Sequence, residues 1–321
     1  MTLPVVISCG EPAGIGPEVA AKAYQVLRST VPMAYVGDPR HLPADTPVVG
    51  IDHPSQAAVA MAQGLPVLTH GFAGHSTPGH PDPKDAQGVI DVIAACVDWV
   101  TQGHASAICT APIHKKALQD GAQFAYPGHT EYLEALAGNG AHAVMMLASD
   151  ALRVVPTTIH IPLADVPAAL TPALLRDTIA ITHRDLQRQF QIKAPRLAIA
   201  GLNPHAGEGG KMGRQEVDWI ADLVRDMVAE GYDLTGPLPA DTMFHAAARA
   251  KYDAAICMYH DQALIPIKTL AFDKGVNVTL GLPFVRTSPD HGTAFDIAGK
   301  GIADETSMVE ALKLAQKMSK T

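Results

Sequence analysis

Short apolar runs alternate with helical segments along this chain, and this alternation constrains its fold more than any other feature. Residues 5–9 form one such run and precede a helical segment through Leu27, while residues 196–202 precede another helical segment at 215–230. The runs are continuous rather than alternately polar and apolar, which is typical of strands buried on both faces of a parallel sheet. The sequence therefore predicts an α/β fold with largely parallel sheets.

Length and charge exclude several classes of protein. With 321 residues the chain is long enough for two domains, and its net charge of −8 without a basic run gives no support to nucleic-acid or anionic-membrane binding. No apolar stretch approaches the ~18 residues that span a bilayer, and the first ten residues lack the basic start of a signal peptide. The four cysteines lie far apart in apolar surroundings, as buried thiols in a reducing compartment do. We therefore expect a cytoplasmic protein.

The richest group of reactive side chains lies between residues 257 and 301. An apolar run at 254–258 ends in a polar cluster that begins at His260, and Lys268, Asn277, Arg286 and a glycine-flanked loop at 290–301 follow. Ligand sites of α/β sheets gather at the carboxyl ends of strands. This stretch therefore predicts a metal-assisted reaction on a small anionic substrate, with ordinary loop polarity as the alternative for any single residue.

Three histidines share one position in the pattern. His160, His205 and His260 each follow directly on a β-rich apolar run. Three imidazoles with an open coordination position suit zinc or a similar transition metal better than an all-oxygen magnesium site. Their separations of 45 and 55 residues match no local zinc motif, so hydrogen-bonded structural histidines are the alternative.

Two strand-to-helix turns are further candidates for anion binding. The glycine-rich turn at residues 10–18 lacks the G-x-G-x-x-G spacing and a Walker lysine, which favours a tight turn over a nucleotide site. Thr130 is expected to cap a helix over 132–137, and His129 and Thr130 together could hold substrate at that helix N-terminus. The pair Lys115-Lys116 either meets phosphate or starts a solvated helix.

The remaining elements follow from the same patterns. Two β-prone runs, at 143–148 and 152–159, meet at Ser149-Asp150 and predict a hairpin. Residues 38–84 predict loops and short strands. Helices are expected over residues 85–103, 173–190, 215–230 and 304–318, and one more is expected to start within 237–242.

Seven segments of the chain carry a common resemblance: residues 10–18, 127–131, 201–208, 237–242, 259–262, 275–283 and 286–294. Together they resemble the family of 4-hydroxythreonine-4-phosphate dehydrogenases, enzymes of pyridoxal phosphate biosynthesis. Glu11 stands where that family commonly has aspartate, and Ala263 stands where glycine often follows the His-Asp-Gln of residues 260–262.

The resemblance implies a set of site residues. It implies that a divalent metal, zinc or else magnesium or cobalt, is held by His160, His205 and His260. It implies substrate contacts at His129, Thr130, Lys268, Asn277 and Arg286, and it makes Asp241 or Lys268 the candidate catalytic base. The 290–301 loop also resembles the adenosine-binding loop of isocitrate and isopropylmalate dehydrogenases, which implies contacts to NAD or NADP from Asp290, His291, Gly292, Asp296 and Gly299.

The resemblance also implies an architecture and a reaction. The implied fold is the two-domain α/β/α sandwich of the isocitrate and isopropylmalate dehydrogenases, with residues 1–128 and 285–321 on the cofactor side. Residues 129–284 then form a central domain with the metal ligands and the interface of a homodimer that shares its active site. The implied reaction is metal-dependent, NAD-linked oxidation of 4-phosphohydroxy-L-threonine, followed by decarboxylation to 3-amino-1-hydroxyacetone phosphate.

Two other functions compete with this one. A paralogous dehydrogenase of 4-phospho-D-threonate or 4-phospho-D-erythronate would carry the same three histidines. A zinc hydrolase would use metal-bound hydroxide and need no NAD, which would leave the 290–301 loop without a task.

Overall fold

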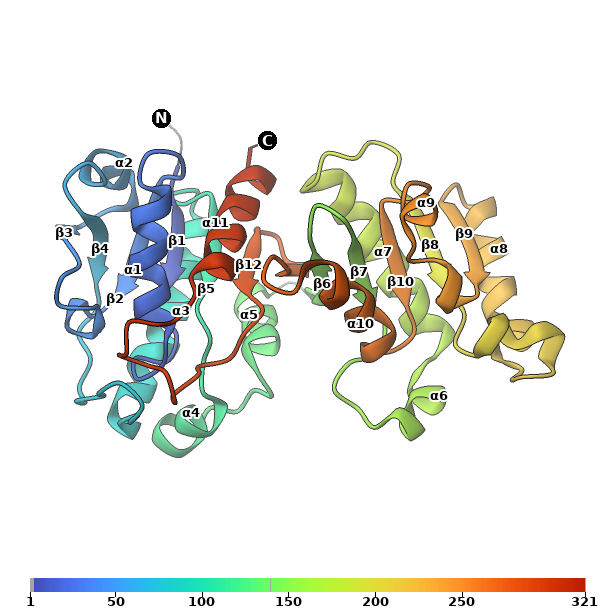
Figure 1. Ribbon diagram of the computed structural model, residues 1–321, viewed down its shortest axis with the longest axis horizontal. Helices are drawn as coiled ribbons and strands as arrows, with labels where there is room; N and C mark the ends of the chain where they lie inside the picture. The colour runs from blue at the N-terminus through green and yellow to red at the C-terminus, as the bar shows by residue number, and fades with distance from the viewer. Residues whose placement is uncertain (1–2, 139, 321) are drawn as a thin grey trace. The chain divides into compact units, whose positions relative to one another are not determined.

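The chain divides into two compact units in the computed structural model, which describes residues 3–138 and 140–320 (Figure 1). Unit 1 comprises Met1–Ala143 and Leu282–Thr321, and unit 2 comprises Val144–Gly281. Compared with the expected division at residues 128 and 284, residues 129–138, 140–143 and 282–284 belong to unit 1 instead of the central domain. Helix α5 (His129–Ala137) packs on α3 (Ala86–Thr101), where the Tyr132 hydroxyl donates to the Ile90 carbonyl oxygen at 3.4 Å, so this segment belongs to unit 1.

The sheet of unit 1 is parallel throughout. Its strand order is β3-β4-β2-β1-β5-β12, and every residue of β1 and β5 is buried. Burial on both faces explains why these strands are continuous apolar runs in the sequence. The strands are β1 (Val5–Ser8), β2 (Met33–Gly37), β3 (Val48–Ile51), β4 (Leu65–Thr69), β5 (Ala107–Thr110) and β12 (Arg286–Pro289).

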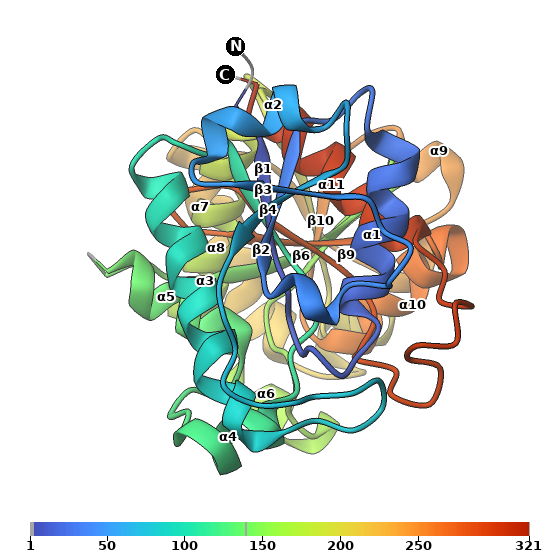
Figure 2. The same cartoon turned by 90° about the vertical axis from the view of Figure 1, so that its left-hand side faces the viewer.

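Helices cover both faces of that sheet, which gives unit 1 the expected α/β/α layers. Figure 2 shows α3 on one side of the strands and α1 and α11 on the other. Pro17 lies in the first turn of α1, as its sequence position predicts. The other helical segments are α1 (Gly16–Leu27), α2 (Ala57–Ala60), α4 (Lys115–Ala122), α11 (Thr306–Met318) and the 3₁₀ turns η1 (Pro39–His41), η2 (Pro54–Gln56) and η3 (Pro83–Asp85).

The sheet of unit 2 is mixed, in the order β11-β6-β7-β10-β8-β9. The predicted hairpin at Ser149-Asp150 is confirmed, because β6 and β7 pair antiparallel, while β7, β10, β8 and β9 run parallel to one another. The strands are β6 (Val144–Ala148), β7 (Arg153–Pro156), β8 (Arg196–Ala200), β9 (Asp233–Leu238), β10 (Ala254–Cys257) and β11 (Val276–Leu280).

Helix α10 packs on β6, β7 and β10, α7 packs on β6 and β11, and α8 packs on β9. The side chains between α10 and the sheet form a buried cluster that includes Leu147, Val154, Ala255 and Ile267. The helical segments are α6 (Val166–Ala169), α7 (Pro172–Arg188), α8 (Ala221–Ala229), α9 (Ala246–Arg249), α10 (His260–Ala271), the 3₁₀ turns η4 (Leu163–Asp165), η5 (Pro204–Gly210) and η7 (Ala240–Thr242), and the π-helix η6 (Glu216–Ile220).

One predicted element is wrong. The helix expected to start within residues 237–242 is instead the end of strand β9 followed by the single turn η7. Leu238 pairs with Ala200 next to a register shift, and β9 lies at the end of the strand order. A strand at that position and next to an irregularity accepts Pro237, whose missing N–H would weaken a central strand.

Within residues 3–138 and 140–320, no helix combines the length and apolar character needed to cross a bilayer.

Candidate functional site

A buried cation lies at the start of β12 in unit 1. Arg286 is 4% exposed, and its Nε and Nη2 donate to the Thr110 hydroxyl at 3.1 and 2.6 Å. Burial lowers the pKa of the Arg286 guanidinium to about 10, so it stays charged at neutral pH. Thr110, the last residue of β5, therefore helps to fix the direction of the guanidinium.

An imidazole approaches the same cation. His129 is the first residue of α5, and its Nε2 is enclosed and has no hydrogen-bond partner. Burial first, and then the positive charge of Arg286, lower the pKa of His129 well below its ordinary value. A neutral imidazole, a buried guanidinium and a helix N-terminus together favour a bound anion.

The predicted cap at Thr130 is wrong. Helix α5 begins one turn earlier than expected, its N-cap is Gly128, and no side chain caps it. A Cβ at Gly128 would lie 3.1 Å from Lys115 Cε and 3.2 Å from Nζ, so the Lys115 side chain lies over this turn. The open N–H groups of α5 and the Lys115 ammonium add to the anion-binding character, while Lys116 pairs with Asp120 at 2.6 Å on the surface of α4.

The three strand-end histidines belong to unit 2, on adjacent parallel strands. The order β7-β10-β8 puts the carboxyl ends that precede His160, His260 and His205 at one edge of the sheet. The strand direction continues beyond β7 and β10, because Thr157 N and Thr158 N donate to the carbonyl oxygens of Cys257 and Met258 at 2.8 and 3.2 Å.

His160 and His260 lie side by side at that edge. Their ring centroids are 5.7 Å apart, and both rings border a cavity of about 260 Å³ together with Tyr259 and Asp261. His260 Nδ1 lies 2.7 Å from Asp261 Oδ1. A carboxylate on Nδ1 orients an imidazole and leaves Nε2 directed at a metal ion, as in many zinc sites.

Gln262 ties two strand ends together. Its Oε1 accepts from the Met258 N–H and its Nε2 donates to the Gly201 carbonyl oxygen, both at 2.7 Å, and the side chain is buried. Met258 follows β10 and Gly201 follows β8. Gln262 therefore fixes the segment that carries His260 against the segment that leads to His205.

His205 begins a left-handed turn. Residues 205 to 209 have φ values of 52°, 51°, 77°, 43° and 65°, and His160 has a φ of 47°. Each non-glycine residue in this conformation raises the conformational free energy by about 1–2 kcal/mol. His205, Ala206 and Glu208 therefore make this turn strained. Backbone strain of this kind is concentrated at functional sites.

These imidazoles have the chemistry of a zinc site. Within the described residues, no three His, Cys, Asp or Glu side chains come close enough to hold a metal ion. His160 and His260 lie side by side, a carboxylate contacts His260, and His205 is exposed.

Three further expected site residues, Asp241, Lys268 and Asn277, belong to unit 2. Asp241 is exposed on η7, which packs against the left-handed turn of His205, and it borders an open cavity of about 450 Å³ with Tyr259 and Asp261. Lys268 lies on α10 with its Nζ 5.7 Å from the centroid of the Phe272 ring. Asn277 lies on β11, opposite Leu147.

The expected cofactor loop of unit 1 is held near its start. Ile15 N donates to the Thr293 carbonyl oxygen at 2.9 Å, and a Cβ at Gly14 would lie 2.9 Å from the same oxygen. Gly14 thus allows the glycine-rich turn to approach the loop, which is the tight-turn role predicted for residues 10–18. Asp290 N donates to the Ser307 hydroxyl at 3.1 Å.

The end of the same loop is held by an ion pair on α1. Lys22 Nζ donates to the carbonyl oxygens of Gly301 and Ala303 at 2.9 and 2.6 Å and lies 3.0 Å from Glu18 Oε1. Glu18 Oε1 also accepts from Ala303 N at 3.0 Å. Within the loop, His291 Nδ1 lies 3.0 Å from the Gly292 carbonyl oxygen, Asp296 is exposed, and Gly299 has a φ of 72°.

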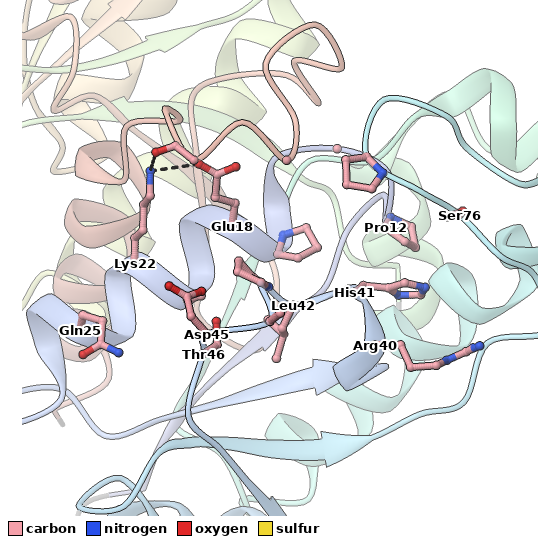
Figure 3. A pocket seen from close by; sticks show the side chains of 18 residues that line it. Pro12, Glu18, Lys22, Gln25, Arg40, His41, Leu42, Asp45, Thr46 and Ser76 are labelled. Carbon is pink, nitrogen blue, oxygen red and sulfur yellow. Dashed lines mark hydrogen bonds and ion pairs between the residues drawn. The ribbon is translucent and has the colours of Figure 1, made fainter.

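The loop borders a cavity of about 560 Å³ in unit 1 (Figure 3). Gly299 and Gly301 form one edge, Glu18 and Lys22 of α1 form a second, and the segment after β2 forms a third. The volume is that of a site for a small ligand or cofactor.

The cations of this cavity are bound within the protein. Arg40 Nε and Nη2 donate to Asp38 Oδ2 at 2.9 and 2.7 Å, and Nη2 also donates to the Phe72 carbonyl oxygen. Burial opposes ionisation of Asp38, yet the hydrogen bonds from Arg40 and from the Phe72 N–H lower its pKa to about 2. Burial lowers the pKa of His41, so that imidazole is neutral near pH 7.

Several of these residues were absent from the sequence-based site. Thr110, Gln262, Glu18 and Lys22 act through contacts between residues far apart in the chain. Gln262 alone had a local signal, because it stands two positions after a strand-end histidine.

In unit 2 the carboxyl ends of parallel strands precede imidazoles, and unit 1 holds a buried guanidinium; each feature is typical of α/β enzymes that bind small anions. The sequence model of the family described as "Pyridoxal phosphate biosynthetic protein PdxA" matches residues 18–315. The chain belongs to this family.

Known relatives match nearly the whole chain. The sequence is 72% identical over 318 residues to 4-hydroxythreonine-4-phosphate dehydrogenase of Roseobacter denitrificans, across 99% of this chain and 98% of that one. A crystal structure of the enzyme of that name from Klebsiella pneumoniae superposes with a TM-score of 0.91 at 36% identity, across 100% and 99% of the two chains. A terephthalate 1,2-cis-dihydrodiol dehydrogenase from Burkholderia xenovorans shares the fold, with a TM-score of 0.67 at 24% identity and 98% coverage of both chains.

The glycine-rich turn at residues 10–18 contains a buried acid, Glu11, whose Oε1 accepts from Ala13 N at 3.1 Å. Burial raises the pKa of Glu11 to about 7, with Asp85 adding to the shift and the Ala13 N–H opposing it. Between pH 4.5 and 7 the unfolded chain releases this proton while the folded chain keeps it, so stability falls as pH rises. Each pH unit contributes about 1.4 kcal/mol, or about 3 kcal/mol in all.

We therefore expect Glu11→Gln to remove this pH dependence. Urea unfolding at pH values from about 5 to about 8 should show the wild type losing stability relative to the variant up to about pH 7 and no further. Glu310→Gln, which alters an ion pair with Lys313 on α11, is the control and should follow the wild type. Parallel pH profiles for Glu11→Gln and wild type would contradict a raised pKa.

Proposed function

We propose that this protein oxidises the secondary hydroxyl of 4-phosphohydroxy-L-threonine with NAD. The β-keto acid so formed loses carbon dioxide to give 3-amino-1-hydroxyacetone phosphate, in the synthesis of pyridoxal phosphate. Similarity over nearly the full chain to enzymes named for this dehydrogenase activity carries the proposal.

Unit 1 supplies the anion-binding part of the proposed substrate site. The buried Arg286 guanidinium can bind a phosphate or carboxylate with two hydrogen bonds, and Thr110 keeps it oriented. His129 and Thr130 add an imidazole and a hydroxyl at the start of α5. Among the residues of unit 2, Lys268 and Asn277 are the proposed substrate contacts.

We assign the metal to His160, His205 and His260 in a homodimer whose two copies share the site. Imidazole nitrogen donors suit zinc best, with cobalt and magnesium as alternatives. A divalent ion bound there supplies Lewis-acid chemistry that lowers the pKa of a hydroxyl. Asp261 keeps the His260 ring in the orientation for binding, and Gln262 keeps its backbone in place.

The hydroxyl proton and the hydride of the substrate go to different acceptors. Asp241 or Lys268 would accept the hydroxyl proton, and bound NAD would supply the nicotinamide that takes the hydrogen on the same carbon as hydride. The electron pair of the carbon–carboxylate bond then moves toward the new ketone as carbon dioxide leaves, and a proton completes the carbon.

The cofactor is assigned to the loop that carries Asp290, His291, Gly292, Asp296 and Gly299. The cavity beside Gly299 has room for the adenosine end of a dinucleotide. Both cations on its wall, Lys22 and Arg40, are hydrogen-bonded within the protein, which supports NAD over NADP because a 2′-phosphate would need a cation. The four cysteines are free thiols, which supports the cytoplasm as the compartment.

NADH formation with three substrates tests the proposal. We expect kcat/KM for 4-phosphohydroxy-L-threonine to exceed that for 4-phospho-D-threonate and 4-phospho-D-erythronate by at least about tenfold, because the amino group finds partners only in the matched site. A preference for either of the other acids would reassign the protein to a paralogous pathway. If none of the three substrates reduces NAD, the protein is not a dehydrogenase of these acids, and a metal-dependent hydrolase becomes the better assignment.

His205→Asn should abolish zinc binding and reduce turnover to near background. Asparagine accepts left-handed backbone, so the turn is retained while the imidazole is lost. Metal analysis after gel filtration, together with NADH formation and circular dichroism, measures the outcome. The control is His245→Asn, an exposed histidine of unit 2 that should behave as wild type. Stoichiometric zinc in His205→Asn would remove His205 from the metal site.

A further inference from the structure

Glu216 is a buried carboxylate outside the set of residues that contact substrate, metal or cofactor in the proposed function. It is 2% exposed and is the first residue of the π-helix η6, which continues into α8. Single turns of π-helix are rare and recur at functional sites. The negative charge lies at the N-terminal end of this helical segment, where it is favoured by the helix dipole.

Both oxygens of Glu216 bind the residue at the entrance of the His205 turn. Oε1 accepts from Asn203 N and Oε2 accepts from Asn203 Nδ2, each at 2.8 Å. Asn203 Nδ2 also donates to Gln215 Oε1 at 2.7 Å. Asn203 precedes His205 by two residues, so these bonds fix the backbone just before the left-handed conformation begins.

The Glu216 carboxylate also packs closely against the backbone of the left-handed turn. A Cβ at Gly207 would lie 2.7 Å from Glu216 Oε2, and a Cβ at Gly201 would lie 3.2 Å from Oε1 and 2.9 Å from the Ala206 Cα. A Cβ at Gly213 would collide with the Asn203 amide. The turn is thus closed around one carboxylate, and glycines at three positions allow that approach.

From this arrangement we propose that Glu216 is a positioning residue for the metal ligand His205. Acting through Asn203 and the backbone of Gly207, it holds residues 205 to 209 in the left-handed conformation that sets the direction of the imidazole. The ligand is then oriented before a divalent cation arrives, and less ordering accompanies binding. This inference rests on the proposed metal-binding function.

A residue that only stabilises the fold would have a different effect. Its loss would lower the melting temperature and leave the metal affinity of the folded chain unchanged. A positioning residue changes affinity in the folded chain, and loss of such partners typically weakens metal binding by about 10–100-fold.

The test is Glu216→Gln, which keeps the volume and removes one acceptor. Its amide presents a donor to Asn203 Nδ2, so either that bond is lost or the Asn203 amide turns over and loses its bond to Gln215 Oε1. The probe is zinc alone, titrated in competition with a chromogenic chelator. We expect the zinc Kd to rise about 10–100-fold, with an unchanged circular dichroism spectrum and faster hydrogen exchange at the amides of Ala206 and Met212, which bond within the turn.

The double variant Asn203→Asp, Glu216→Gln reverses the polarity of the lost bond and conserves net charge. The amide introduced at position 216 would donate to the carboxylate introduced at position 203, so zinc affinity should return to within about threefold (~0.6 kcal/mol) of wild type. Asp218→Asn is the matched control, because Asp218 lies exposed on the same π-helix and pairs with Arg214 at 2.7 Å. It should bind zinc as the wild type does.

Three results would overturn the inference: a zinc Kd of Glu216→Gln within about threefold of wild type, a turn that exchanges no faster, or a double variant that stays as weak as the single one. If Glu216→Gln does not fold, Asn203→Ala makes the same test, since it breaks the side-chain link and leaves Glu216 in place. His205→Asn separates the two proposals. If it binds zinc like wild type, the metal site itself is wrong; if it loses zinc while Glu216→Gln does not, only the positioning role fails.

Discussion

Parallel pairing of β10 with β7 on one side and β8 on the other is the constraint on which the candidate metal site depends. It brings three strand ends, and with them His160, His260 and His205, to one edge of the sheet of unit 2. A slip of one residue would turn every side chain of β10 to the opposite face of the sheet, so the close packing of this fully buried strand fixes the register. The buried Gln262 extends that constraint beyond the strands by joining the ends of β10 and β8.

Beyond the strands the backbone departs from its preferred conformations where the proposed ligands stand. His160 and His205 are both left-handed, and the turn that begins at His205 continues so through residue 209. The conformation persists because Asn203, Glu216 and the surrounding glycines determine it from several directions. In unit 1 a side-chain hydrogen bond, and not a strained backbone, orients the candidate binding group. The Thr110 hydroxyl orients Arg286 in a buried position, where its positive charge favours an anion.

Local patterns in the sequence predict most of the fold. The apolar runs at residues 5–9, 196–202 and 254–258 are strands, the hairpin at Ser149-Asp150 forms, and the strand-end histidines lie at one sheet edge. What the sequence does not predict are contacts chosen by tertiary structure. The start of α5 at His129 and the pairing of a proline-containing β9 with β8 override local signals. The bond between Asn203 and Glu216 joins the residue after the apolar run at 196–202 to the helix expected over 215–230. Periodicity identifies which face is apolar and carries no information on which polar groups meet.

The most direct test of this account is anomalous diffraction from crystals of the zinc-loaded protein. We expect one zinc peak for each chain, with nitrogens of His160, His205 and His260 about 2.0–2.1 Å from the ion and at least one of the imidazoles supplied by a second copy of the chain. A zinc peak surrounded by other residues, or a protein that takes up zinc without engaging these three imidazoles, would contradict it.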